Sequence, residues 1–257
     1  MCYQLKSYLK FLWRSTNQHG VHSPFVYDLV TKCFYDTTGY CQYALLKDFR
    51  KKLLMSAEEI EVIDFGQGSR VFRSNKRKVA AIAKHAGISP KRQRLLFRLT
   101  QYLKPEKVLE LGTSLGIATT AIALGNPSAV VTTIEGCSNT AKVAQEAFNS
   151  FQLIEIQLYA KPFETFFAER PSEKYNLVFV DGNHNKEATL HYFELLLKNT
   201  TTNAVLIFDD IYWSPQMTEA WEVIQKHPKV SVSIDTFQWG MVFFRPEQQK
   251  EHFIIRL

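Results

Sequence analysis

The segment of residues 108–119 constrains the fold of this chain more than any other part of its sequence. It reads Val-Leu-Glu-Leu-Gly-Thr-Ser-Leu-Gly-Ile-Ala-Thr and begins with a short, largely apolar stretch. Gly112 and Gly116 follow that stretch, and glycine lets a ligand approach the backbone closely. We expect a strand, a glycine turn and the start of a helix, which is a building unit of α/β sheets.

The predicted turn offers polar groups to a ligand. Thr113 or Ser114 can cap the helix that we expect to begin near Leu115. Free N–H groups of the turn and the helix dipole would suit an anionic or polar part of a ligand. Glu110 stands at the end of the strand, where a carboxylate would repel a pyrophosphate but accept hydrogen bonds from an ammonium group.

A second predicted strand, at residues 130–135, also ends in a carboxylate. Its sequence is Val-Val-Thr-Thr-Ile-Glu, and β-branched residues favour strands. Glu135, 25 residues after Glu110, lies where doubly wound sheets hold the ribose hydroxyls of a nucleoside cofactor. The glycines are spaced G-x-x-x-G rather than G-x-G-x-x-G, which argues against a dinucleotide. An ordinary strand, turn and helix with a surface glutamate is the alternative.

The pattern E-x-G-x-x-x-G, followed by the acid Glu135, resembles motif I and the next acidic position of class I methyltransferases that use S-adenosylmethionine (SAM). The resemblance covers about residues 95–244. It implies that SAM is the cofactor, with Phe163 or Cys137 packing on its adenine. The cofactor-binding residues that it implies are Glu110, Gly112, Thr113, Ser114, Gly116, Glu135, Gly136, Phe163 and Asp181.

Strands and helices are predicted to alternate from Lys107 onward, which indicates a parallel sheet with helices on both faces. The expected strands cover residues 108–111, 130–135, 155–159, 176–181 and 204–209. Residues 230–237 and 240–245 form a predicted hairpin, so the last strand must be antiparallel. We expect an α/β fold with a Rossmann-like, doubly wound, seven-stranded sheet, an architecture that the resemblance also implies.

The domain prediction places a helical, basic extension or lid at residues 1–94 and a methyltransferase domain at residues 95–257. In the extension, Ser23 and Pro24 have the pattern of a helix start. The motif from Asp64 to Ser69 also looks like a SAM loop, but no acid follows it at the right distance. We therefore predict an ordered loop there, with a lid as one role.

Carboxylates end two further predicted strands, with Asp181 on one and the pair Asp209 and Asp210 on the other. Ligands of open α/β sheets bind at the carboxyl ends of the strands. If these strands are neighbours, their tips lie about 5 Å apart. Oxygen ligands suit Mg²⁺, Mn²⁺ or Ca²⁺, so all three residues are candidate metal ligands. Without a metal, Asp181 would position SAM, and Asp210 would have a structural role in the loop or as a helix cap.

These residues resemble the metal-dependent O-methyltransferases, such as catechol O-methyltransferase. That family holds Mg²⁺ with an Asp and an Asp-Asn pair, and a Lys three residues after the first Asp takes the proton. Here Asp210 replaces the Asn and His184 replaces the Lys. The resemblance implies O-methylation of a small hydroxylated acceptor, with Asp181 and His184 as catalytic residues. Neutral imidazole accepts a proton near pH 7, so His184 could act as the base in place of Lys. A metal ligand, or a residue that simply faces the substrate, are the alternatives for His184. Asn183 and Trp213 would line the side of the site that holds the acceptor.

The net charge of +6 is concentrated between Ser69 and Arg98, where ten Lys and Arg residues occur without any Asp or Glu. This basic segment could bind nucleic acid, an acidic molecule or an acidic partner. An RNA- or protein-directed methyltransferase is therefore an alternative function. A SAM-binding protein without turnover is another, and a solvated helix face is the plainest explanation of the charge.

The remaining features narrow the setting. No run of about 18 apolar residues occurs, so we expect no transmembrane helix and no membrane partner. The first residues lack an apolar signal core, and the four cysteines include no CxxC pair. We expect a cytoplasmic protein with reduced cysteines, and a homodimer remains open.

Overall fold

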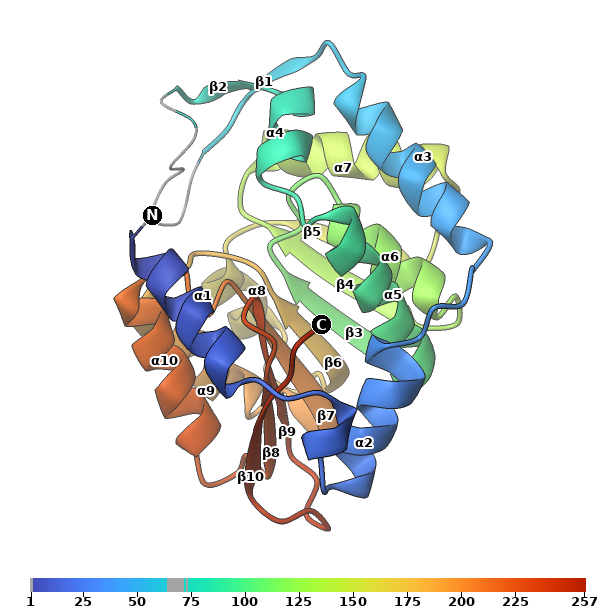
Figure 1. Cartoon of the computed structure of the whole chain (residues 1–257). Coiled ribbons are helices and arrows are strands. Elements are labelled where there is room, and N and C mark those ends of the chain that lie inside the picture. Colours follow the sequence, from blue (N-terminus) through green and yellow to red (C-terminus); the bar gives the residue numbers. More distant parts are fainter. Residues whose placement is uncertain (1, 64–71, 73) are drawn as a thin grey trace. The chain divides into compact units, whose positions relative to one another are not determined.

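The computed structural model describes residues 2–63, 72 and 74–257 (Figure 1). The predicted lid motif from Asp64 to Ser69 lies outside the described residues. The chain divides into two compact units, and each is described by itself. The terminal unit comprises residues 1–35 and 171–257, and the central unit comprises residues 36–170.

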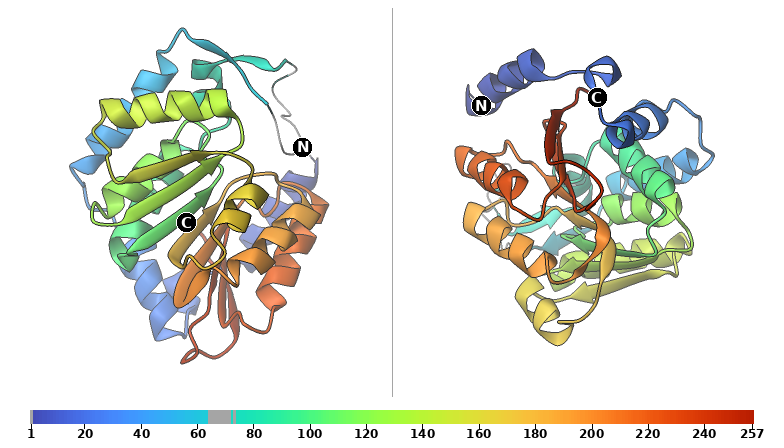
Figure 2. Two further views of the ribbon diagram at one scale, coloured as in Figure 1. Left: turned by 180° about the vertical axis from the view of Figure 1, so that it is seen from behind. Right: turned by 90° about the horizontal axis from the view of Figure 1, so that it is seen from below.

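The central unit contains three parallel strands in the order β3-β4-β5, which lie side by side in Figure 2. Its elements are α3 (Gln42–Leu54), β1 (Glu59–Glu61), β2 (Lys76–Lys78), α4 (Val79–His85), α5 (Pro90–Leu103), β3 (Lys107–Leu111), α6 (Ile117–Gly125), β4 (Val130–Glu135), α7 (Ser138–Ser150), β5 (Ile156–Ala160) and α8 (Phe163–Glu169). Helices follow each of these parallel strands, as the alternating pattern predicted.

Helix α5 shows why this sequence folds locally as it does. The Ser89 side chain accepts a hydrogen bond from the Arg92 N–H, and Pro90 occupies the first turn. The helix ends at Lys104, whose φ of 46° is left-handed. Its buried residues include Leu95, Leu96, Phe97 and Leu99, which supply one apolar face.

The terminal unit joins both ends of the chain. Its elements are α1 (Cys2–Arg14), η1 (Gln18–Gly20), α2 (Pro24–Leu29), η2 (Val30–Phe34), β6 (Tyr175–Val180), α9 (Lys186–Leu196), β7 (Thr200–Asp209), α10 (Pro215–Lys226), β8 (Val232–Asp235), β9 (Trp239–Phe243) and β10 (Glu251–Ile254). Its strands run in the order β10-β8-β9-β7-β6. Helices α9 and α10 lie side by side (Figures 1 and 2).

The predicted α/β fold class is confirmed, including the antiparallel strand near the end of the chain. Strand β9 is antiparallel to both β7 and β8, and β6 is parallel to β7. The expected number of seven strands is one too low, because β10 pairs in parallel with β8. Strand β10 begins with Glu251 and His252, which are exposed, so it lacked the apolar pattern of a buried strand.

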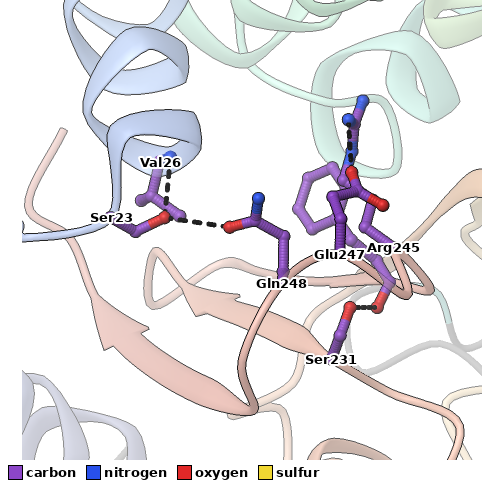
Figure 3. Close-up of polar contacts among 7 residues, drawn as sticks. Ser23, Val26, Ser231, Arg245, Glu247 and Gln248 are labelled. Atoms are coloured by element: carbon purple, nitrogen blue, oxygen red, sulfur yellow. Dashed lines mark hydrogen bonds and ion pairs between the residues drawn. The ribbon is translucent and has the colours of Figure 1, made fainter.

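The N-terminal segment is bound to the C-terminal segment within the terminal unit. Ser23 accepts a hydrogen bond from the Val26 N–H at 3.4 Å, and its hydroxyl donates to Gln248 Oε1 at 3.3 Å (Figure 3). The Tyr35 hydroxyl donates to the Arg256 carbonyl at 2.7 Å. The two compact units therefore divide the chain at other places than the predicted boundary between residues 94 and 95, which stays a prediction.

Helix length in the described part of the chain also bears on the membrane expectation. No helix there is long and apolar enough to cross a membrane.

Candidate active site

The glycine turn of the central unit has the left-handed backbone that its sequence suggested. The φ angles are 102° at Gly112, 48° at Ser114 and 79° at Gly116. Glycine adopts left-handed φ angles freely, whereas this conformation is energetically unfavourable for Ser114. Strained non-glycine residues of this kind concentrate at functional sites, so the conformation of Ser114 supports a functional role for the turn.

The expectation of free N–H groups in this turn is wrong for three residues. The N–H groups of Gly112 and Thr113 both donate to the Ile134 carbonyl, at 2.9 and 3.1 Å. The Ser114 N–H donates to Glu135 Oε2 at 2.8 Å. These bonds fasten the turn to strand β4, and they leave these N–H groups engaged rather than ready for a phosphate.

The predicted side-chain cap of the following helix is also wrong. Helix α6 is capped by Gly116, without a side-chain hydrogen bond. The Thr113 hydroxyl is instead bonded to the Thr133 hydroxyl at 2.6 Å. The cap was misplaced because the turn is two residues longer than the sequence pattern suggested, and α6 begins at Ile117.

Glu135 is held in place at the end of β4. Its carboxylate accepts one hydrogen bond from the Ser114 N–H and another from the Cys137 N–H, at 2.8 and 2.9 Å. The residue is half-buried. A carboxylate has about four acceptor positions, which suits this residue type to the hydroxyl groups of a ligand. Gly136 separates it from the start of α7.

Glu110 is the most unusual charged residue of the central unit, because its side chain is fully buried. Its Oε2 atom accepts hydrogen bonds from the hydroxyls of Thr119 and Thr133. Its Oε1 atom is buried without a hydrogen-bond partner. Burial raises the pKa of this carboxyl to about 7. An unpaired buried acceptor is costly, so a positively charged donor is the ligand group that would best complete this site.

A contact that the sequence did not reveal lies beside Glu135. The Asn139 amide donates to the Glu61 carbonyl at 2.8 Å, and the Ile63 N–H donates to Cys137 Sγ at 3.4 Å. The end of β1 therefore packs on the start of α7. Strand β2 is entirely basic, so the small β1–β2 hairpin carries no strand pattern. Cys137 is buried in this contact.

Phe163 stands at the first position of α8, directly after the loop that follows β5. It is half-buried, whereas Phe166 and Phe167 of the same helix are buried. Contact between Phe163 and an adenine ring stays a prediction.

Gly116 leads to a stability prediction. A Cβ atom at this position would lie 2.3 Å from the Phe148 ring, in addition to the unfavourable φ of 79°. We expect Gly116→Ala to lower the free energy of unfolding by about 2–3 kcal/mol in urea titrations. Gly39→Ala is the matched control, because nothing lies within 4 Å of its added Cβ. Equal stability of both variants would contradict the close packing of Gly116.

The terminal unit gathers the predicted acceptor-side residues at the ends of two neighbouring strands. Strands β6 and β7 pair in parallel, with Val180 opposite Phe208. Asp181 and Asp209 directly follow this pair in the chain, as predicted. Left-handed φ angles occur in both adjoining loops, at residues 183, 184 and 210. This concentration of strained backbone marks the edge as a functional candidate.

His184 lies close to Asp181 in the loop after β6. Its Nε2 atom is 3.7 Å from Asp181 Oδ1, and its ring lies 5.7 Å from the ring of Trp213. The Asn183 amide donates to the Tyr192 hydroxyl at 3.3 Å. The loop therefore holds a candidate proton acceptor beside a negative charge.

The predicted metal ligands do not form a metal-holding cluster in this structure. Asp209 is buried, and its Oδ1 atom accepts the N–H of Asp210 at 2.7 Å. Among the residues described, no group of three or more His, Cys, Asp or Glu side chains is arranged to hold a metal ion. The donor set of Asp181, Asp209 and Asp210 therefore does not fit Mg²⁺ here, and metal binding stays a prediction.

Several arginine side chains of the basic segment contact aromatic residues within the central unit. The Arg98 guanidinium donates to the Tyr43 hydroxyl at 3.2 Å, and Arg94 lies over the Tyr43 ring at 4.9 Å. Arg77 lies over the Phe72 ring at 5.0 Å. These contacts give the segment a packing role, so its charge alone does not require a nucleic-acid partner.

Comparisons with known proteins bear on the fold of this chain. Residues 109–211 match the family described as a methyltransferase domain. The SAH-bound methyltransferase PaMTH1 of Podospora anserina is 14% identical, with a TM-score of 0.62 over 88% of this chain and 97% of its own. The O-methyltransferase of Bacillus cereus in complex with SAH is 16% identical, with a TM-score of 0.55 over 83% and 95% of the two chains.

A third solved structure is TomG of Streptomyces achromogenes, an O-methyltransferase involved in tomaymycin synthesis and solved with SAM. It is 18% identical, with a TM-score of 0.55 over 63% of this chain and 82% of its own. The chain therefore has the fold of class I methyltransferases.

Proposed function

We propose that this protein is a SAM-dependent O-methyltransferase that acts on a small hydroxylated acceptor. The observation that carries the proposal is the pair of carboxylates on neighbouring strands of the methyltransferase domain. Glu110 has one buried oxygen without a partner, and Glu135 is held at the end of β4. An ammonium group and a ribose diol, which SAM presents together, complement these two carboxylates.

The cofactor contacts of the proposal follow from these residues. Glu110 Oε1 accepts a hydrogen bond from the ammonium group, and Glu135 accepts bonds from the ribose hydroxyls. Gly112, Thr113, Ser114, Gly116 and Gly136 shape the backbone around them, and Phe163 packs on the adenine ring. When SAM is bound, it supplies an electrophilic methyl group. The solved structures of the Bacillus cereus and Streptomyces enzymes with SAH and SAM support this assignment.

The proposed catalytic residues are His184 and Asp181. His184 accepts the proton of the acceptor hydroxyl at an imidazole nitrogen, and the Asp181 carboxylate lies 3.7 Å from its Nε2 atom, beside the charge that forms. The deprotonated oxygen is the nucleophile for the methyl group. No step is assigned to a metal ion, because Asp181, Asp209 and Asp210 do not fit one in this structure.

The proposal predicts that His184→Ala lowers kcat about a hundredfold with little change in the affinity for SAM. His184→Lys is expected to restore part of the activity, because the O-methyltransferases that this chain resembles carry Lys at that position. His191→Ala is the matched control, since His191 is an exposed residue of α9. The measurement is transfer of labelled methyl groups from SAM to a panel of phenols, catechols and aliphatic alcohols.

The same assay tests metal dependence and the class of acceptor. Full activity in EDTA would support the metal-free mechanism, whereas loss in EDTA and recovery with Mg²⁺ would overturn it. Transfer to RNA or protein in place of small hydroxylated molecules would contradict the acceptor class. SAM binding without transfer to any acceptor would indicate a SAM-binding protein without turnover. A cytoplasmic setting fits the proposed cofactor and reduced cysteines.

A further inference from the structure

Helix α1 exposes an apolar row to solvent. Leu5, Leu9 and Trp13 follow one another at intervals of four residues, which places them on one face of the helix. Their exposed fractions are 59%, 59% and 87%. Large apolar side chains exposed together in this way mark an interaction surface rather than an ordinary helix surface.

A different face of α1 anchors the helix to the terminal unit. The Tyr3 hydroxyl donates to the Thr218 hydroxyl of α10 at 2.7 Å. Phe11 is buried, and its ring lies 5.5 Å from the ring of Phe237. Figures 1 and 2 show α1 beside α10 in the terminal unit. Because these contacts hold the helix in place, the apolar row is exposed to solvent in the folded protein.

A row of cations flanks the apolar row. Lys6, Lys10 and Arg14 each follow one of the apolar residues by one position, so they occupy the adjoining strip of the helix surface. All three are exposed, and the helix contains no acidic residue. Apolar side chains beside a cationic strip are typical of helices that lie in the interface of a membrane with anionic lipids.

We propose that α1 binds the surface of an anionic lipid bilayer, with Leu5, Leu9 and Trp13 inserted among the lipids. Lys6, Lys10 and Arg14 contact the headgroups, which complement their charge. Trp13 suits the boundary between headgroups and acyl chains. A second copy of the chain is a poorer occupant, because a symmetric contact would bring the cationic strips together. The proposal departs from the expectation of no membrane partner, which rested on the absence of an apolar run long enough to span a bilayer, because attachment to a membrane surface needs no such run. It stands independently of the proposed reaction.

The test is co-sedimentation of the full chain with vesicles of phosphatidylcholine alone or with 30% phosphatidylglycerol. We expect binding to the anionic vesicles that weakens about tenfold in 0.5 M NaCl. The variant with Leu5→Ser, Leu9→Ser and Trp13→Ser is expected to lose at least about tenfold in affinity. Lys6→Gln with Lys10→Gln is expected to reduce binding to anionic vesicles only. Val223→Ser is the matched control, because Val223 is an exposed apolar residue of α10.

Two further readouts make the test decisive. Thermal melting establishes that each variant is folded, and the shift of tryptophan emission on adding vesicles, compared between wild type and Trp13→Phe, reports insertion of Trp13. Absence of binding to anionic vesicles would overturn the proposal, as would equal binding by the triple variant. A stable dimer that the triple variant converts to a monomer would also overturn it, because the apolar row would then be covered by a second copy.

Discussion

Glu135→Gln is expected to weaken SAM binding about a hundredfold or more while leaving the protein folded. The carboxylate accepts the Ser114 and Cys137 N–H groups, and in the proposed complex it also accepts two ribose hydroxyls. Hydrogen bonds to a charged acceptor contribute about 1.5–3 kcal/mol each, so losing the charge at two of them costs about 3 kcal/mol or more. Isothermal titration calorimetry with SAM measures the change directly.

The matched control for this variant is Glu146→Gln, which neutralises an exposed residue of α7 in the same unit. It should bind SAM as the wild type does. A thermal melt close to that of the wild type would establish that Glu135→Gln is folded. Unchanged SAM affinity in folded Glu135→Gln would remove Glu135 from the cofactor site.

Glu110→Gln is expected to stabilise the protein at alkaline pH and to weaken SAM binding. Burial raises the pKa of Glu110 to about 7 from an ordinary value of 4.5. Between these two pH values the native state holds more protons than the unfolded state, so the free energy of unfolding falls as pH rises. Glutamine removes this cost, and above pH 8 the variant should gain about 3 kcal/mol. Below pH 4.5 the gain should vanish.

Urea titrations at pH 4.5, 6 and 8.5 measure this dependence, with Glu146→Gln again as the control. A gain that grows with pH identifies the buried charge as its source. A gain or loss of the same size at every pH would instead indicate a packing effect at Glu110. SAM affinity is expected to fall at least about tenfold at pH 8.5, because Gln cannot pair its charge with the ammonium group. The variant would thus be more stable and less functional. Substitutions in binding sites often show this trade-off between stability and function.

The local part of the site could be predicted from the sequence. The glycine turn, the helix after it and the acid Glu135 at the end of the next strand depend on residues that are close in the chain. The resemblance to the metal-dependent O-methyltransferases implied that the strands ending in Asp181 and Asp209 are neighbours, and the pairing of β6 with β7 confirms it. Short-range spacing therefore sufficed for the glycine turn and its flanking elements, whereas the order of the strands came from the resemblance.

The remaining features depend on contacts that spacing does not reveal. The bonds of Glu110 to Thr119 and Thr133, and the bonds that occupy the N–H groups of the turn, join residues of different elements. Strand β10 and the β1–β2 hairpin consist largely of polar or charged residues, so they lack an apolar period. For α1, the spacing of apolar residues predicted a helix, but it did not reveal which of the apolar side chains pack against the rest of the protein.

The measurement that tests the central claim most directly is calorimetric titration of the wild-type protein with SAM, and separately with NAD⁺, at pH 8. The account predicts that one SAM binds per chain and that NAD⁺ does not bind, because Glu110 accepts an ammonium group and repels a pyrophosphate. Binding of NAD⁺ without binding of SAM would contradict the assignment of the glycine turn and its two carboxylates to SAM.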